Sequence, residues 1–279
     1  MNPVFQCGRF EFAISPEPYC PLVMGILNVT PDSFSDGGKF RNLDLALDHA
    51  QLMIEAGVDI IDIGGESTRP GSKPLSLQEE LDRVMPAVYA LRDSGVAISV
   101  DTYKPEVMRE VIAAGADMVN DIKGFQSRES VSAVADSNVG LCIMHMQKTP
   151  ETMQTAPAYE DVVSEVHAYF RERLQEFESS GIERARISLD PGFGFGKSLQ
   201  HNVDLFKKIP YFSDEFGLPL LIGISRKSMI GGLTGKSTDQ RLAGSLAGAL
   251  AGVQLGAAIV RVHDVPETVD ALKVMRNLI

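Results

Sequence analysis

The chain has few cysteines, no tryptophan and a shortage of basic residues. Its 279 residues include three Cys, no Trp, 26 Lys or Arg and 37 Asp or Glu. No Cys-x-x-Cys pair occurs, so neither a disulfide framework nor a structural zinc site is expected. Residues 1–20 show no secretory signal, and we expect a cytoplasmic protein. The net charge of −11 argues against general binding to nucleic acid or anionic membranes.

Only one long stretch without charge occurs, and it raises the question of a membrane span. Residues 242–260 carry no charge, and a glycine recurs at every fourth position from Gly244 to Gly256. This spacing is typical of membrane helices that dimerise. The stretch is rich in Ala and Gly, however, and polar Ser245 interrupts it. We therefore interpret it as a helix with a small-residue face packed on a neighbour, followed by a buried strand.

Eight short apolar runs alternate with longer amphipathic segments from residue 22 to the end. Continuous apolar composition predicts strands buried on both faces, as in a parallel sheet. The segments between them predict helices, for example at 43–56, 76–94, 104–114 and 159–180. Eight strand–helix units favour a closed (β/α)8 TIM barrel over an open α/β sheet. The predicted strands are residues 22–29, 58–64, 96–101, 116–121, 140–145, 185–190, 218–225 and 257–262.

The segment before the first predicted barrel strand has a different pattern. The sequence VFQCGRFEF alternates on both sides of Cys7 and Gly8, which predicts a short β-hairpin that would cover the bottom of the barrel. No internal repeat, low-complexity segment or linker occurs. We therefore expect one α/β domain over residues 1–279, with the hairpin within 1–21 and the barrel over 22–279.

Polar side chains lie at the end of every predicted strand. The carboxyl ends of barrel strands meet at one rim, where active sites of this fold form. A single carboxylate there more often caps a helix, but capping does not account for eight polar ends. Cations at this rim suit a phosphate or pyrophosphate, and carboxylates suit a flat heterocycle rich in N–H groups. The polar positions are Asn28, 66–69, Asp101, Asn120, Asp121, His145, Asp190, 225–228, Arg261 and His263.

Three features resemble known sites without matching them. PGFGFGKS at 191–198 has Pro191 where the phosphate-binding loop requires its first glycine. We therefore expect no ATP site there, and its glycines predict a flexible loop that lets the backbone approach a ligand. GISRKS does not match G-x-S-x-G, which makes Ser225 a poor candidate nucleophile. His145 has no spaced ligand partner, so we predict a packed histidine and not a metal ligand.

Seven stretches occur in the order found in the dihydropteroate synthase family, which the chain resembles from residue 22 to its end. Two positions depart from the family pattern, since Tyr103 stands where a small residue is commoner and KGF follows NDI at 123–125. The matching stretches are MGILNVTPDSFSDGG (24–38), GGESTRPG (64–71), SVDTYKPEV (99–107), NDI (120–122), LDPGFGFGK (189–197), GISRKSMIG (223–231) and RVHDV (261–265).

The resemblance implies a transferase of folate biosynthesis. It would condense (7,8-dihydropterin-6-yl)methyl diphosphate with 4-aminobenzoate to give 7,8-dihydropteroate and diphosphate. The electron-rich pterin can stabilise a cation at the methylene carbon, so ionisation by C–O cleavage can precede attack by the amine. Catalysis would then consist of electrostatic stabilisation and positioning. The resemblance further implies a Mg²⁺ cofactor, inhibition by sulfonamides and a homodimer, for which the glycine face of 244–256 offers a contact.

The resemblance also implies roles for individual residues. Pterin-binding residues would be Asp101, Asn120, Asp190, Lys227 and Arg261. Pyrophosphate would be bound by Asn28, Thr68, Arg69, Arg261 and His263, with Asn28 as the protein ligand of Mg²⁺ and Asp32 in support. The aminobenzoate slot would be lined by Phe34, Thr68, Pro70, Lys227 and Ser228. Catalysis would depend on Lys227, Arg261 and His263.

Two other functions remain open on the sequence alone. A barrel like the methyltetrahydrofolate:corrinoid methyltransferases would share the pterin-holding groups, but it needs no pyrophosphate site. STRPG, SRKS and RVHDV therefore argue against it. A non-catalytic pterin-binding paralogue is the other alternative, and the presence of Asn28, Lys227, Arg261 and His263 disfavours it.

Overall fold

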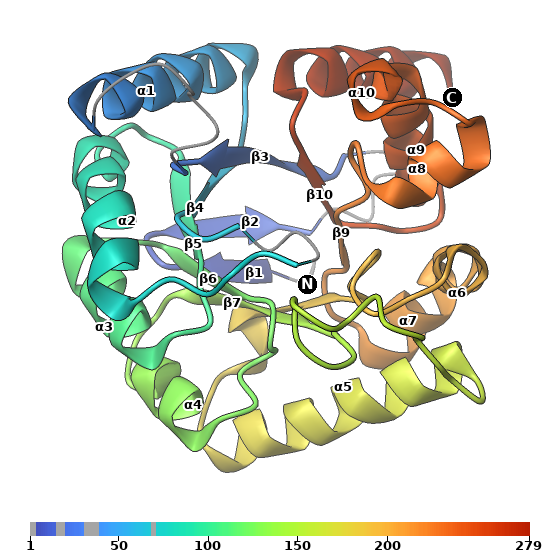
Figure 1. Ribbon diagram of the computed structural model, residues 1–279, viewed down its shortest axis with the longest axis horizontal. Helices are drawn as coiled ribbons and strands as arrows, with labels where there is room; N and C mark the ends of the chain where they lie inside the picture. Colours follow the sequence, from blue (N-terminus) through green and yellow to red (C-terminus); the bar gives the residue numbers. More distant parts are fainter. Residues whose placement is uncertain (1–3, 15–19, 31–38, 68–70) are drawn as a thin grey trace.

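Eight parallel strands form a barrel surrounded by helices in the structure, a computed structural model that describes residues 4–14, 20–30, 39–67 and 71–279 (Figure 1). The predicted TIM-barrel architecture is confirmed. The strands are β3 (Leu22–Asn28), β4 (Ile60–Gly64), β5 (Ala97–Asp101), β6 (Met118–Asp121), β7 (Gly140–Met144), β8 (Ile187–Asp190), β9 (Leu221–Ile222) and β10 (Ile259–Val262).

Helices follow the strands in the chain and cover the outside of the barrel. Ser76 caps the second one through a reciprocal capping box with Glu79, and Gly115 ends the third with a φ of 104°. The helices are α1 (Lys39–Ala56), α2 (Leu77–Leu91), α3 (Pro105–Ala114), α4 (Arg128–Ala135), α5 (Val162–Ser179), α6 (Leu199–Lys207), α7 (Ile209–Phe216), α8 (Ser228–Thr234), α9 (Leu242–Gln254) and α10 (Val265–Leu278). In the described part of the chain, none of them is both long and apolar enough to cross a membrane.

The sheet closes between its first and last strands. The strand order is β8-β7-β6-β5-β4-β3-β10-β9, and a parallel bridge joins Leu189 to Leu220. The predicted strand 218–225 is much shorter in the structure, where β9 covers only Leu221–Ile222. The reason is that the chain already turns at Ile224, whose carbonyl accepts the Lys227 N–H at 3.1 Å.

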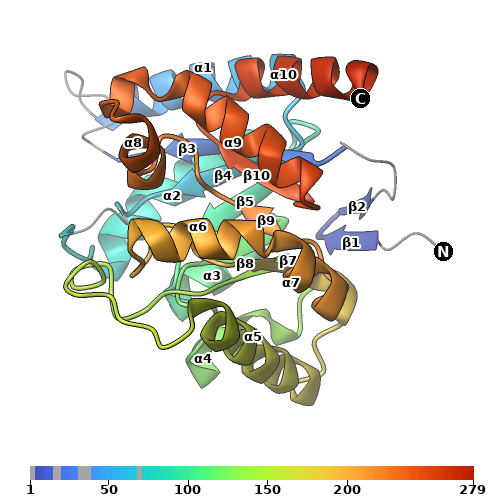
Figure 2. The same cartoon turned by 90° about the vertical axis from the view of Figure 1, so that its right-hand side faces the viewer.

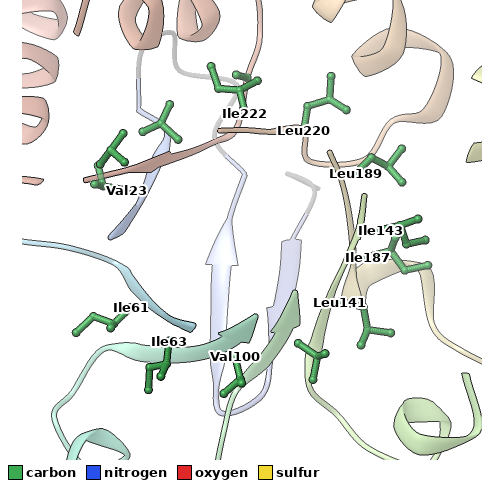
Figure 3. Close-up of a cluster of buried hydrophobic side chains, with 14 of the residues drawn as sticks. Val23, Ile61, Ile63, Val100, Leu141, Ile143, Ile187, Leu189, Leu220 and Ile222 are labelled. Carbon is green, nitrogen blue, oxygen red and sulfur yellow. The ribbon is translucent and has the colours of Figure 1, made fainter. Parts of the chain in front are cut away.

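Alternation along each strand separates an apolar outer layer from a mixed inner layer. Figure 3 shows side chains such as Ile61, Ile63 and Val100 on the outside of the strands, facing the helices. The residue between two outward side chains points into the barrel, and Asp62 lies there between Ile61 and Ile63. The apolar strands therefore bury their outer face against helices while carrying chemistry on their inner face.

The N-terminal hairpin covers the bottom of the barrel, as predicted. Strands β1 (Val4–Cys7) and β2 (Phe10–Ala13) pair antiparallel, and Figure 2 shows them at the end of the barrel opposite the long loops. Phe5 and Cys7 are fully buried against inward side chains from the beginnings of the barrel strands. Those side chains are Met24, Ile60, Ala97, Met118, Cys142, Leu221 and Ile259.

Helix α9 confirms the interpretation of residues 242–260 as a helix followed by a strand, and three of its glycines face the barrel. A Cβ added to Gly244 would lie 2.6 Å from Ile230 Cγ2, and one added to Gly248 would lie 2.5 Å from Ile224 Cδ1. Gly252 is similarly close to Ile222. These three glycines therefore let α9 approach its own barrel and α8.

Candidate active site

A buried network of charged side chains lies inside the barrel near the carboxyl ends of β4, β5, β6 and β10. Asp62 is fully buried and accepts hydrogen bonds from Ser99 Oγ at 2.6 Å, Asn120 Nδ2 at 3.1 Å and Arg261 Nε at 2.6 Å. A second guanidinium nitrogen of Arg261 donates to Asp101 Oδ2 at 3.0 Å. Three residues that the sequence assigns to the pterin pocket therefore meet here, around a carboxylate that it did not single out.

Strand register explains why these side chains meet. In the parallel ladders Asp62 lies beside Ser99 on the neighbouring strand, and Asp101 lies beside Asn120. Asp62 and Asp101 point inward because residues on either side of each point outward to the helices. Arg261, on β10, reaches both carboxylates across the barrel interior. The geometry follows from the alternation within four strands and needs no loop to assemble it.

The network balances charge among side chains that are largely shielded from solvent. Burial disfavours the charged form of Arg261 and would lower its pKa. The adjacent carboxylates of Asp62 and Asp101 outweigh this effect and raise the pKa of Arg261 above the usual value. Burial also raises the pKa of Asp101 to about 7, although the positive charge of Arg261 opposes the shift. Asp101 can therefore change protonation near neutral pH, whereas Arg261 stays a cation.

Asp190 and Lys227 are two further charged groups at the same rim, and they interact electrostatically. Asp190, at the end of β8, is buried and accepts the Gly192 N–H at 2.7 Å. Lys227 donates from Nζ to the Phe193 carbonyl at 2.7 Å and lies 4.6 Å from the centre of the Phe195 ring. Burial raises the pKa of Asp190 and lowers that of Lys227 to about 8, and in each case the partner's charge opposes the shift.

The glycine-rich loop after β8 is more constrained than the sequence predicted. Gly194 donates its N–H to Asn202 Oδ1 at 2.7 Å and accepts from Gln154 Nε2 at 2.5 Å. The Gly196 carbonyl accepts the Tyr159 hydroxyl at 2.9 Å. Gly194 and Gly196 have φ values of 83° and 66°, which glycine adopts without strain. The glycines therefore permit a particular loop shape, and hydrogen bonds to neighbouring segments hold it.

The loops after β9 and β10 contribute the remaining rim residues that the structure describes. His263 lies beside Ser225, with its Nδ1 and the hydroxyl oxygen 3.2 Å apart. Burial and the nearby Arg261 lower the pKa of His263 to about 4. Contrary to the sequence prediction that it adds positive charge, His263 is thus a neutral hydrogen-bonding group in this state. Arg226 is paired with Asp264 through its Nε at 3.0 Å, so its charge is also compensated.

Other predicted site residues lie at the rim or outside the described residues. Asn28 ends β3, where its Oδ1 is 3.4 Å from the position of a Cβ on Gly64. Ser228 is exposed and begins α8. The pyrophosphate and aminobenzoate residues Thr68, Arg69, Phe34 and Pro70, and the supporting Asp32, lie outside the described residues.

A family model described as pterin binding enzyme matches residues 24–263 of the chain. A dihydropteroate synthase of Escherichia coli strain K12 is 53% identical over 256 residues, which are 91% of this chain and 90% of that protein. One from Neisseria meningitidis serogroup B is 48% identical over 281 residues, 99% of this chain and 97% of that protein. The chain belongs to the dihydropteroate synthase family. It is therefore an enzyme, a transferase, and the methyltransferase alternative is not supported.

Solved structures of the family share the fold almost completely. The dihydropteroate synthase of Xanthomonas albilineans with 4-aminobenzoic acid has a TM-score of 0.92 and 45% identity, and the match covers 100% of this chain and 98% of that one. The enzyme of Burkholderia cenocepacia complexed with 7,8-dihydropteroate has a TM-score of 0.88 and 47% identity, covering 99% and 96%. A Yersinia pestis dihydropteroate synthase with a sulfonamide drug complex has a TM-score of 0.90 and 46% identity, covering 98% of each chain.

The two departures from the family pattern contact each other outside the Asp62 network. Lys123 Nζ lies 3.7 Å from the centre of the Tyr103 ring. The Tyr103 hydroxyl donates to Glu66 Oε1 at 2.7 Å, and Lys104 Nζ donates to Glu66 Oε2 at 2.7 Å. These residues tie the loop after β4 to those after β5 and β6. They replace none of the polar groups that the pterin pocket requires.

Asp62 and Ser99 are the members of this network that the sequence analysis missed. Asp62 lies within VDIIDIG and Ser99 within VAISVD, two runs whose apolar residues predict buried strands. A signal was present in both runs. A charged or polar residue between two large apolar residues of a buried strand occupies the opposite face, and in a barrel that face is the interior. Alternation within the apolar runs would have identified both positions.

Proposed function

We propose that this chain joins (7,8-dihydropterin-6-yl)methyl diphosphate to 4-aminobenzoate and releases diphosphate. The observation that supports this most directly is the buried Asp62–Asp101–Asn120–Arg261 network. It offers carboxylates and a fixed cation to a flat, N–H-rich ring within the barrel. The relatives crystallised with 4-aminobenzoic acid and with 7,8-dihydropteroate match nearly the whole chain, which supports the same pair of substrates here.

The pterin would lie in the interior between the two charged groups of residues. Its amino group and ring N–H are hydrogen-bond donors. Asp101, at the end of β5, and the buried Asp190, at the end of β8, are acceptors at the same rim. Asp190 retains acceptor capacity beyond its bond to Gly192. Asn120 and Lys227 can donate to the ring carbonyl and ring nitrogens, and Arg261 can stack on the ring. Burial strengthens each of these interactions relative to water.

The leaving pyrophosphate would be stabilised by groups at the outer edge of the rim. Arg261 and His263 lie two residues apart at the end of β10, and Thr68 and Arg69 follow β4 in the sequence. His263 is neutral in this state, so an arriving dianion would favour its protonation. The electron pair of the broken C–O bond goes to the pyrophosphate oxygen, and the fixed cations offset the developing negative charge.

The amine nitrogen of 4-aminobenzoate would then form the new C–N bond and lose one proton. Lys227 and the exposed Ser228 are the described residues assigned to its slot, together with Phe34, Thr68 and Pro70. An aromatic amine is uncharged near neutral pH, so attack requires placement more than a strong base. We propose that sulfonamides, which resemble 4-aminobenzoate, compete for this slot.

The donor set is compatible with a Mg²⁺ ion that arrives with the pyrophosphate. Among the described residues, no cluster of three or more His, Cys, Asp or Glu side chains could hold a metal alone. Asn28 supplies a hard amide oxygen at the rim, and Mg²⁺ commonly takes few protein ligands because it retains water and phosphate oxygens. Such an ion would neutralise pyrophosphate charge. Chelation should therefore abolish turnover without lowering the melting temperature, and full activity in chelator would contradict this role.

The experiment that tests the proposed reaction uses labelled 4-aminobenzoate. Purified protein supplied with the pterin ester and Mg²⁺ should convert the label to 7,8-dihydropteroate and release an equal amount of diphosphate. The same protein should transfer no methyl group from methyltetrahydrofolate to a corrinoid. Methyl transfer without condensation would contradict the proposed function, and tight pterin binding without either reaction would indicate a non-catalytic paralogue.

We further propose a cytoplasmic homodimer. Large apolar side chains are exposed on α8, α9 and α10. Leu233 and Val274 are each 58% exposed and Leu278 is 79% exposed, and a partner could cover them. Light scattering on purified protein should give twice the chain mass, and a monomer at micromolar concentration would contradict the proposal.

A further inference from the structure

Lys197 is a buried cation to which the proposed reaction assigns no role. It ends the glycine-rich loop, and only 3% of its surface is exposed. Its ammonium lies 3.0 Å from the Gly192 carbonyl, 3.1 Å from the Phe195 carbonyl, 3.2 Å from the His145 carbonyl and 3.0 Å from His145 Nδ1. An ammonium donates three hydrogen bonds, so these four acceptors saturate it. A buried charge is tolerated only when it is satisfied in this way.

The acceptors of Lys197 lie next to the groups that hold Asp190 and Lys227. The Gly192 N–H donates to Asp190 Oδ1 at 2.7 Å, while the Gly192 carbonyl accepts from Lys197. The next carbonyl, of Phe193, accepts from Lys227 Nζ at 2.7 Å. Lys197 thus holds the loop on both sides of the carbonyl that fixes Lys227. It also holds the loop against the end of β7 through His145.

The position of Lys197 in the sequence suggests phosphate binding, but its contacts indicate another role. In a phosphate-binding loop the lysine after the last glycine reaches the ligand. Here the ammonium binds backbone carbonyls and a histidine within the protein. Burial lowers the pKa of Lys197 to about 7, and the charge of Asp190 opposes that shift. Lys197 therefore interacts electrostatically with the Asp190 carboxylate, while its hydrogen bonds are made within the protein.

We propose that Lys197 is a positioning residue for the condensation. Its ammonium fixes the loop of residues 191–196 against His145, and the loop fixes the Asp190 carboxylate and the Lys227 ammonium that bind the pterin. The proposal rests on the proposed function, because these two groups act on a pterin only if the reaction occurs at this rim. Lys197 acts through the loop backbone, so its loss should affect the pterin ester more than 4-aminobenzoate.

The first test replaces Lys197 by a side chain of similar length without charge. Lys197→Met should lower kcat/KM for the pterin ester by about 10–100-fold, as for other groups that orient binding residues. The KM for 4-aminobenzoate at saturating pterin ester should change less than kcat/KM for the pterin ester, because Lys227 is assigned to both sites whereas Asp190 is assigned to the pterin alone. Lys207→Met, at the exposed end of α6, is the matched control and should leave both parameters unchanged.

The second test is chemical rescue, which a purely structural lysine would not show. Lys197→Ala leaves space for three methylene groups and an ammonium, so propylammonium should restore kcat/KM for the pterin ester in a saturable manner. Tetramethylammonium carries the charge but donates no hydrogen bond, and it should not restore activity. Circular dichroism and melting temperature establish that each variant is folded before its rates are compared.

Three results would overturn the proposal. One is a folded Lys197→Met variant with the kcat/KM of the wild type. Another is a folded Lys197→Ala variant whose lost activity propylammonium does not restore. The third is failure of both variants to fold even with propylammonium, because Lys197 would then serve folding alone. Absence of condensation by the wild type would instead contradict the proposed function, so the two failures are distinguishable.

Discussion

Two buried carboxylates at opposite ends of the barrel have different kinds of partners. Asp117, just before β6 at the bottom, accepts the Ile98 N–H at 3.0 Å, the Arg9 N–H at 3.2 Å and the Arg9 guanidinium at 2.8 Å. Asp62, near the rim, accepts only from the side chains of Ser99, Asn120 and Arg261 among the described residues. Both carboxylates are almost inaccessible to water, so burial alone does not separate their roles.

The difference lies in whether the donors can change partners. Backbone N–H groups are fixed by the fold, and Asp117 uses them to attach the hairpin to the barrel. Side-chain donors such as Asn120 and Arg261 can turn toward a ligand without unfolding a strand. We infer that the bottom carboxylate stabilises the fold and that the rim carboxylates bind substrate. The predictions below test this division, beginning with the largest effect.

Changes at the rim should remove binding and leave the fold intact. Lys227→Ala and Asp190→Ala should each lower kcat/KM for the pterin ester. The expected loss of binding free energy is about 2–5 kcal/mol, as for a charged hydrogen-bonding partner. Lys227→Ala should melt close to the wild type. Asp190→Ala also leaves the Gly192 N–H without its acceptor, so it should remain folded but lose some stability. Steady-state kinetics and calorimetry measure the two quantities. Normal pterin-ester binding by both variants would mean that the pocket is wrongly assigned.

A change at the bottom should have the opposite effect. Asp117→Ala leaves the buried Ile98 N–H without its acceptor, which costs about 1–3 kcal/mol of unfolding free energy. The variant should retain the wild-type kcat/KM wherever it is folded, because Asp117 is at the far end of the barrel. Urea unfolding and kinetics at low temperature measure these effects. Loss of activity in the folded variant would show that the two ends are not independent.

The pH dependence of activity should report the titration of Asp101 and Lys227, the two rim groups assigned to the pterin with pKa values near neutrality. Asp101 must be ionised to accept from the pterin, and its pKa is raised to about 7, so kcat/KM should fall as the pH drops below that value. Lys227 must be protonated to donate, and its pKa is lowered to about 8, so kcat/KM should fall above it. Asp101→Asn should lose the acidic limb. A flat profile from about pH 6 to about pH 9 would contradict both assignments.

Most of the fold could be predicted because each strand carries an apolar run and helices end at glycines such as Gly115. The end of β9 could not be placed, since Ile224 and Ser225 look like strand residues and only the turn to Lys227 ends the ladder. The rim cations Lys227 and Arg261 could be located from their strand-end positions. The neutrality of His263 and the pairing of Arg226 could not, because both depend on neighbours distant in sequence. Asp62 was missed because its run was treated as uniform.

The affinity of the wild type, Asp117→Ala and Asp62→Asn for a dihydropterin tests most directly whether the bottom carboxylate stabilises the fold and the rim carboxylates bind substrate. Calorimetric titration should give the same Kd for the wild type and for Asp117→Ala at a temperature where both are folded. Asp62→Asn keeps the shape of the side chain but removes the charge that holds Arg261, and it should bind at least about tenfold more weakly, a loss of about 1.4 kcal/mol. Wild-type affinity in folded Asp62→Asn, or weakened affinity in folded Asp117→Ala, would contradict this account.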